Sequence, residues 1–334
     1  MKKFLSVVLV VLTVLSLGSL VGCGDKEEVL TGEGLKFGMG VYSYVGENAS
    51  ATAEKNGKGE VVTTVAAVLL DKDGKILKSD IDSISATVEF TSTGTAVPAS
   101  EFKTKREPGD NYGMVAYGNA KDEWYKQVDN FEALAKGKTF DEVKALMVED
   151  GKGNDDVIKA GCTINIADFV KALEKAVNNA TKCVAMSEDE INVAIIASQG
   201  ENSAATAEAD GKNGVTLTVA ATTVNKDKKV TAARNDELNF DITFDSTGAI
   251  KTDLSANILT KFERGESYGM VAYGNAKKEW FEQSEILNKA CIGKTSKQIS
   301  ALAAKDGTAS EELQTAGCTI AVSEMVKALV KSAK

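Results

Sequence analysis

The chain contains no histidine among its 334 residues. This absence excludes nucleophiles that histidine activates, such as the Ser–His and Cys–His pairs of hydrolases, and it removes the commonest ligand of transition metals. Any redox or transfer chemistry must therefore rest on carboxylates or on a cofactor.

Cysteine motifs are also missing. The five cysteines form no CxxC or CxxCH sequence, which argues against thioredoxin-like, zinc and c-type haem sites, so no metal site is expected. Cys162 and Cys318 hold equivalent positions in an internal duplication and are not expected to pair with each other. The sequence leaves open whether Cys183 and Cys291 form a disulfide.

Positive charge is in deficit, with 39 Lys and Arg against 48 Asp and Glu and a formal net charge of −9. An acidic surface repels phosphate backbones, so nucleic acid is not an expected partner. The hydrophobic content of 43% and the charged content of 26% are ordinary for a soluble globular protein, and the length allows two domains.

The N-terminus, MKKFLSVVLVVLTVLSLGSLVGC, has the pattern of a secretory signal. Two lysines precede an apolar run from Phe4 to Leu17, which is short for a membrane-spanning helix. The ending LVGC resembles a bacterial lipobox, which predicts a lipoprotein signal peptide at residues 1–22 and a diacylglycerol on Cys23. Residues 23–34 would be the lipidated cysteine and a flexible tether, because two or more acyl chains anchor stably. The alternative is a plain signal peptide with a coincidental cysteine. The polar segment GDKEEVLTGEG, which follows Cys23 directly as a tether would, favours the lipoprotein interpretation.

The sequence YGMVAYGNAK occurs twice without a change, at Tyr112–Lys121 and at Tyr268–Lys277. It belongs to two diverged copies of one domain, residues 35–181 and 190–334. The residue numbers of equivalent positions differ by 154 as far as Gly94, and by 156 from the decapeptide onward. A repeat of this length indicates tandem domains rather than a solenoid. We therefore expect each copy to fold on its own sheet and helices.

Each copy begins with strand signals. The run GEVVTTVAAVLL is rich in β-branched residues and ends at the turn DKDGK, while DSISATVEF and ELNFDITF alternate apolar and polar residues with a period of two. Helical segments follow these strands in both copies. The predicted fold class is α+β, with two tandem homologous domains that each form an antiparallel sheet followed by packing helices.

The helix boundaries carry capping signals. The first long helix is predicted to start after Asn119 as its N-cap and to end at Gly137 as its C-cap. A last helix with an apolar stripe follows the sequence AGCT in both copies. Two capping boxes are predicted, at Thr139 with Glu142 and at Thr295 with Gln298.

The segments DDVIKAGCTINIADF and EELQTAGCTIAVSEM share acidic residues, then Ala-Gly-Cys-Thr, then an amphipathic helix. This pattern resembles the flavinylation motif of covalent FMN-binding domains, which is written around Ser-Gly-Ala-Thr before a helix. The resemblance implies that an FMN transferase uses FAD to join FMN phosphate to the hydroxyls of Thr163 and Thr319. The chain departs from that motif by alanine in place of the first Ser or Thr, by cysteine in place of the small alanine, and by acidic residues further upstream.

A phosphate on a threonine at a helix start would lie against unpaired N–H groups and the positive end of the helix dipole. Gly161 and Gly317 would let the backbone approach it closely. The alternative is that Thr163 and Thr319 are only N-caps. An isoalloxazine ring needs flat partners, so the repeated aromatic residues are candidates for flavin contact as much as for core packing: Tyr112, Tyr117, Trp124, Tyr268, Tyr273 and Trp280.

The signal, the tether and both domains together resemble the two-domain flavinylated surface lipoproteins of extracellular electron transfer in Gram-positive bacteria. The resemblance implies an electron carrier with two covalent FMN groups and no substrate site of its own. It would be lipid-anchored on the extracellular face of the cell membrane. Electrons would come from a membrane NADH dehydrogenase through a quinone and pass to ferric iron or free flavins. The alternative is a cofactor-free, ligand-binding or pheromone-precursor surface lipoprotein.

Overall fold

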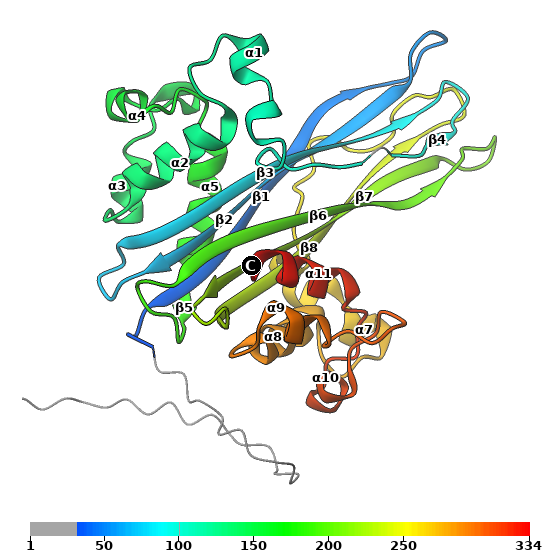
Figure 1. Cartoon of the computed structure of the whole chain (residues 1–334). Helices are drawn as coiled ribbons and strands as arrows, with labels where there is room; N and C mark the ends of the chain where they lie inside the picture. Colours follow the sequence, from blue (N-terminus) through cyan, green and yellow to red (C-terminus); the bar gives the residue numbers. More distant parts are fainter. Residues whose placement is uncertain (1–31, 100) are drawn as a thin grey trace, which may run out of the picture.

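The computed structural model of the chain describes residues 32–99 and 101–334 (Figure 1). The predicted signal peptide, the lipidation site Cys23 and most of the tether lie outside these residues. Within the described part, no helix has both the length and the apolar character that crossing a membrane requires.

The first repeat forms a five-stranded sheet in the order β4-β3-β2-β1-β5. Three long antiparallel strands dominate it, and two short strands close its edges. The ten residues that end β2 are all buried, which explains its unbroken apolar run, since both faces of this sheet are covered. The strands are β1 (Lys36–Ala49), β2 (Gly57–Leu70), β3 (Ile76–Phe90), β4 (Ala96–Val97) and β5 (Thr181–Lys182).

The second repeat forms a three-stranded antiparallel sheet in the order β6-β7-β8. Its strands are β6 (Glu190–Ser203), β7 (Gly211–Val224) and β8 (Val230–Phe244). They correspond to β1, β2 and β3 at the offset of the duplication. The predicted α+β class, with a sheet and following helices in each copy, is confirmed.

Helices follow the sheet in both repeats. Those of the first repeat are the 3-10 helices η1 (Gly109–Asn111) and η2 (Glu149–Gly151), and α1 (Met114–Gly118), α2 (Trp124–Ala135), α3 (Phe140–Lys144), α4 (Asp155–Ala160) and α5 (Ala167–Asn178). Those of the second are the 3-10 helix η3 (Gly265–Tyr268), and α6 (Lys261–Arg264), α7 (Met270–Gly274), α8 (Trp280–Cys291), α9 (Ser296–Ser300), α10 (Glu311–Ala316) and α11 (Ser323–Ser332).

The helix ends are partly as the sequence predicts. Both capping boxes are present, at Thr139 and at Thr295. Gly137 directly follows the C-cap of α2 in the left-handed conformation, with φ 80°. The prediction that Asn119 is an N-cap is wrong: Glu123 caps α2, and Asn119 ends the short helix α1 with φ 51°.

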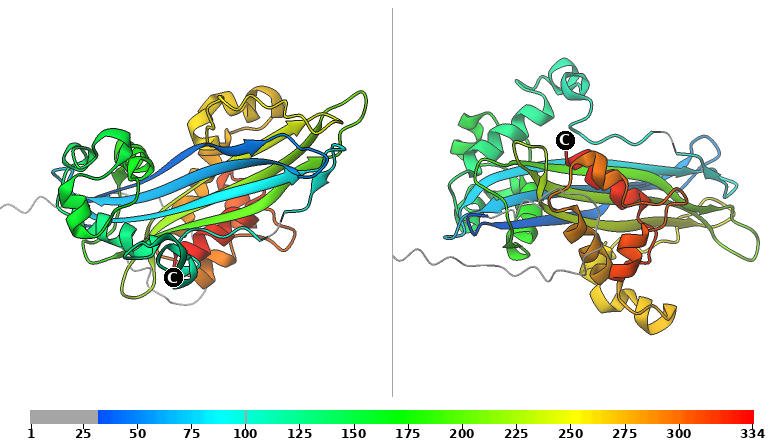
Figure 2. Two further views of the ribbon diagram at one scale, coloured as in Figure 1. Left: turned by 90° about the horizontal axis from the view of Figure 1, so that it is seen from above. Right: turned by 60° about the horizontal axis from the view of Figure 1, so that its bottom comes forward.

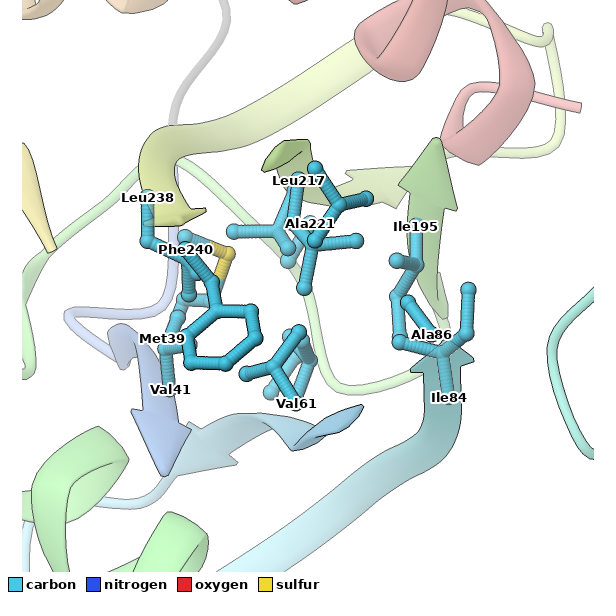
Figure 3. Packing of buried hydrophobic residues seen from close by; sticks show 14 of the residues in the cluster. Met39, Val41, Val61, Ile84, Ala86, Ile195, Leu217, Ala221, Leu238 and Phe240 are labelled. Carbon is cyan, nitrogen blue, oxygen red and sulfur yellow. The ribbon is translucent and has the colours of Figure 1, made fainter. Parts of the chain in front are cut away.

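The buried side chains of the described residues form three apolar clusters. Two lie between a sheet and the helices of its own repeat. The third, which we call the central layer, lies between the two sheets and takes side chains from both repeats. Figure 2 shows the sheets packed together with helices on their outer sides, and Figure 3 shows side chains such as Val61 and Phe240 meeting in the central layer.

A pseudo-two-fold axis relates the repeats across this layer. Phe90 stacks on its counterpart Phe244, with ring centroids 4.2 Å apart and planes at 6°. Near these rings, the amide of Ala51 donates to the carbonyl oxygen of Gly248 at 2.8 Å. The equivalent bond runs the other way, from the amide of Ala205 to the carbonyl oxygen of Gly94, at 2.6 Å.

Two equivalent ion pairs also cross between the repeats. Lys175 pairs with Glu263 at 2.5 Å, and its counterpart Lys331 pairs with Glu107 at 2.6 Å. Each lysine also donates to a backbone carbonyl oxygen of the first sheet strand of a repeat, at 2.8 and 2.9 Å. The two repeats are therefore arranged like the subunits of a symmetric dimer.

One buried aspartate in each repeat ties the third long strand to the segment that leads to the helices. Asp82 accepts a hydrogen bond from the amide of Arg106 at 3.2 Å, and its counterpart Asp236 accepts one from the amide of Phe262 at 3.1 Å. Burial raises the pKa of Asp82 to about 6 and that of Asp236 to about 7.

This burial predicts a pH-dependent contribution to stability. The folded-state pKa of Asp236 lies above the unfolded value of about 3.9, so the folded state binds more protons between these values. The contribution of Asp236 to the free energy of unfolding is therefore full below about pH 4 and is lost as the pH rises through about 7. We expect Asp236→Asn to raise the free energy of unfolding at pH 7.5 relative to the wild type, but not at pH 4. Urea titrations at both pH values test this, and an equal change at both would contradict it.

Candidate functional site

The repeated decapeptide forms a short helix, α1 or α7, with the same conformation in both copies. The glycine before the helix is left-handed, with φ 96° at Gly113 and 85° at Gly269. The asparagine after it is also left-handed, with φ 51° at Asn119 and 53° at Asn275. Glycine and asparagine are the residues that adopt this conformation most readily, which accounts for their identity in both copies.

A buried carboxylate holds the start of this short helix. Both oxygens of Glu123 accept hydrogen bonds from successive backbone amides, those of Gly113, Met114 and Val115, at 2.9–3.1 Å. In the second copy, Glu279 accepts from the amides of Met270 and Val271 at 2.9 and 3.0 Å. The orphan amides of the helix start are thus satisfied by a negative charge.

A buried glutamine one turn later holds the threonine of AGCT. The Oε1 atom of Gln127 accepts from the backbone amide of Thr163 at 2.8 Å and from its hydroxyl at 3.0 Å. Gln283 accepts from the amide and the hydroxyl of Thr319 at 2.7 and 3.2 Å. Both repeated motifs are therefore fastened to the first turns of one helix, α2 or α8.

Thr163 and Thr319 lie ahead of the last helices and not at the helix starts that the sequence predicts. The last helices start at Ala167 and Ser323, after Ile166 and Val322 as N-caps, so each threonine precedes the N-cap by three residues. Neither the helix-start position nor the N-cap alternative is therefore met, because each AGCT segment continues as a loop before its helix begins. Both threonines are exposed residues, although each hydroxyl donates to a buried glutamine.

The residues around the threonines have structural roles. Gly161 and Gly317 are the left-handed C-caps of α4 and α10, each with φ 100°. Cys162 and Cys318 are fully buried in the outer cores, and burial raises the pKa of the Cys162 thiol to about 11. A side chain that fills a core explains why these cysteines are retained.

The candidate aromatic residues divide into two groups. Trp124 and Trp280 are 5% and 3% exposed and belong to the outer cores. Tyr117 and Tyr273 are 92% and 89% exposed, and each ring lies across the left-handed glycine that starts its helix.

Tyr112 and Tyr268 lie between these extremes. Tyr112 is 37% exposed, and Tyr268 is partly buried with the Arg264 guanidinium 5.0 Å from its ring centroid.

The residues fit FMN only in part. An exposed threonine whose hydroxyl is held by a glutamine fits an attachment point for a phosphate. The tryptophans do not fit as ring partners, because the core already covers them. The surroundings of the two threonines also differ: Asp122 and Asn130 lie beside Gly161, whereas the methylene chain of Lys278 lies beside Gly317.

The four cysteines of the described residues, Cys162, Cys183, Cys291 and Cys318, are free. The open question of a Cys183–Cys291 disulfide is thereby answered, since Cys291 is buried in the second outer core and Cys183 lies against the carbonyl oxygen of Leu35. Among the same residues, no group of His, Cys, Asp and Glu side chains could hold a metal ion.

Sequence reasoning missed the two residues on which the site is built, the buried glutamate and glutamine. The signal was present, because the decapeptide runs directly into KDEWYKQ in one copy and KKEWFEQ in the other. The shared Glu, Trp and Gln have a helical spacing that places Glu and Gln one turn apart.

A protein named chlorophenol reductase, from Desulfitobacterium hafniense, is 30% identical to this chain over 124 residues. The match covers 33% of this chain and 38% of that protein. The chain therefore spans well under half of the length of this relative, whose name belongs to redox chemistry. No family model matches the chain, and no solved structure matches it.

Proposed function

We propose that this protein is a lipid-anchored extracellular electron carrier with FMN bound covalently to Thr163 and Thr319. The observation that carries the proposal is the pair of exposed threonines, each with its hydroxyl held by a buried glutamine in an equivalent arrangement. The partial similarity to a protein with a redox name agrees with it. Bound FMN would supply one- and two-electron transfer, which the side chains alone lack.

The chain's own residues would expose and orient the attachment points. Gln127 and Gln283 fix the backbone of the loop and accept a hydrogen bond from each threonine hydroxyl, so esterification of that hydroxyl would release this second bond. The tyrosines of the decapeptide, rather than the buried tryptophans, are the aromatic rings that remain available for a flavin. Maturation would require an FMN transferase. A membrane NADH dehydrogenase and quinone would be the electron source, and ferric iron or free flavins the acceptors.

Intact mass of the membrane-extracted protein, produced with an active FMN transferase, tests the proposal. The expected mass includes a lipidated Cys23 as the first residue and two FMN groups. Thr163→Val and Thr319→Val should each remove one flavin, and the double variant should remove both while its circular dichroism stays unchanged. Ferric iron reduction should fall with the flavin count.

The surroundings predict an order of loading. The threonine-linked phosphodiester carries one negative charge, which the Asp122 carboxylate near Gly161 would repel and the Lys278 side chain near Gly317 would attract. With limiting transferase, Thr319 should therefore be modified before Thr163. Flavin that persists in the double variant would contradict the attachment sites, and a wild-type protein with no flavin mass would refute the redox function.

The second candidate is a cofactor-free surface lipoprotein that binds a ligand through the decapeptides. It is favoured by Tyr117 and Tyr273, whose exposed rings are identical in both copies although neither is needed to fill a core. This function becomes the better account if the flavin mass is absent. Tyr117→Ala and Tyr273→Ala would then reduce binding without reducing stability.

A further inference from the structure

The pseudo-two-fold arrangement creates two seams where a strand of one sheet lies beside a strand of the other. The first seam lies between β3 and β6, and the second lies between β1 and β8. They are built from equivalent positions of the two repeats, so each seam serves as an internal control for the other.

The first seam is closed by a carboxylate and a guanidinium. Asp80 accepts a hydrogen bond from the amide of Val193 on β6 at 2.6 Å. Arg106 lies 3.5 Å from Asp80 and 2.9 Å from Glu132, and its Nε donates to a carbonyl oxygen of β3 at 2.6 Å. An amide at the edge of one sheet is thus satisfied by an acidic side chain of the other.

The second seam has the opposite chemistry at these positions. Arg234 stands at the position of Asp80, and Phe262 stands at the position of Arg106. Arg234 pairs with Glu285 at 2.6 Å and donates to the Thr181 hydroxyl at 2.5 Å. The second seam therefore lacks the acidic acceptor and the bridging arginine of the first.

The counterpart of the Val193 amide is the amide of Met39 on β1. The Met39 carbonyl oxygen accepts from Asn179 at 2.6 Å, which shows that the hydrogen-bonding edge of this residue faces away from β2, and both residues line a cavity at this seam. In an antiparallel strand, the N–H and C=O of one residue point to the same side. Arginine has donors only, so Arg234 cannot take the role that Asp80 has for Val193.

A cavity occupies the second seam. Met39, Val41 and Phe262 supply apolar walls, and Arg234, Lys175 and Thr181 bring hydrogen-bond donors. A second hollow continues along the seam and shares Arg234 and Thr181 with the first. Arg234 and Met39 thus line one space, whose walls are hydrocarbon in part.

We propose that this cavity binds a small organic monocarboxylate, whose carboxylate takes the place that the Asp80 side chain occupies at the first seam. A guanidinium fork and a backbone amide are the donors that suit a carboxylate. The apolar walls fit a short hydrocarbon tail. This site is separate from Thr163 and Thr319 and does not depend on flavin.

The charges around the cavity favour a single negative charge on the ligand. Glu285 pairs with Arg234, and Glu263 pairs with Lys175 at 2.5 Å, so the two cations are already partly neutralised. Asp236 also lines the cavity. A phosphate or dicarboxylate would add a second charge beside these three carboxyl groups and would be repelled.

Titration calorimetry and amide NMR of the full-length chain with butyrate test the proposal, with butyramide as the uncharged control. We expect saturable butyrate binding, a shift of the Met39 amide resonance and no comparable effect of butyramide. Arg234→Gln should weaken butyrate binding by about tenfold or more, because it removes a charged donor. Asp80→Asn, at the equivalent position of the first seam, should bind butyrate as the wild type does.

A second variant does not depend on the stability of Arg234→Gln. Arg234→Asp places at the second seam the acceptor that Asp80 provides at the first, so it should block butyrate while circular dichroism confirms the fold. Equal binding of butyrate and butyramide would overturn the proposal. So would an unshifted Met39 amide, or wild-type butyrate binding in both Arg234→Gln and Arg234→Asp.

Discussion

A fragment of residues 35–181 is expected to form a homodimer instead of a stable monomer. Separated from the second repeat, it would expose its half of the central layer, in which a buried large apolar side chain contributes about 1.5–3 kcal/mol. Exposing several such side chains would cost a free energy comparable with the whole net stability of a domain, which is about 5–15 kcal/mol. The side chains at stake in this half include Phe37, Met39, Val41, Val61, Val65, Leu69, Ile84, Val88 and Phe90.

The pseudo-symmetry explains why a second copy of the fragment could cover this surface. In such a dimer, Phe90 would stack on Phe90, and Lys175 would meet Glu107 of the other copy, as the equivalent residues do in the chain. Sedimentation at several concentrations measures the association. A fragment that is monomeric and melts cooperatively at micromolar concentration would show that each repeat folds alone, as the sequence first led us to expect.

The same layer can be probed in the intact chain. Phe90→Ala should lower the free energy of unfolding by about 3–5 kcal/mol, since it removes a fully buried ring from a stacked pair. Tyr117→Ala is the matched control, because that ring is exposed and its loss should change stability by no more than about 0.5 kcal/mol.

The second large effect is expected from Glu123→Ala, which should release the start of α1. Three amides would lose a charged acceptor, and a single such hydrogen bond contributes about 1.5–3 kcal/mol. Hydrogen exchange at Gly113, Met114 and Val115 should accelerate by about two orders of magnitude. Glu123→Gln should have a smaller effect, because it keeps one oxygen acceptor.

The second copy supplies the control for this experiment. Glu279→Ala should accelerate exchange at Met270 and Val271 and leave the decapeptide of the first repeat protected. Unchanged exchange at residues 113–115 in Glu123→Ala would show that the carboxylate does not hold the helix. The result also bears on the proposed function, because a loosened decapeptide would present Tyr112 and Tyr117 in many orientations.

The sequence could predict those parts of the fold that depend on neighbouring residues. The period of two in β3 and β8, the glycine after α2 and the capping boxes at Thr139 and Thr295 are local signals, since the groups involved lie within a few residues. The duplication was also readable, because identical segments recur at a constant offset.

The candidate site was less predictable. A glutamate after the decapeptide looks like any exposed helical residue, and nothing local shows that its carboxylate is buried beneath Met114. Likewise, Trp124 and Tyr117 are both aromatic residues near one motif, yet one fills a core and the other faces solvent. The location of Thr163 was missed because the loop after AGCT extends three residues further than the apolar pattern of the last helix suggests.

The sequence by itself determined the duplication, the α+β order of elements and the left-handed turns that glycine and asparagine permit, because each follows from the chemistry of residues close together in the chain. Only the tertiary structure decided that the two sheets share a central layer, that Glu123 and Gln127 fasten the repeated motifs, and that the seam at Arg234 differs from the seam at Asp80. These features join residues from 8 to more than 100 positions apart. Their partners are chosen by packing, which no local pattern in the chain records.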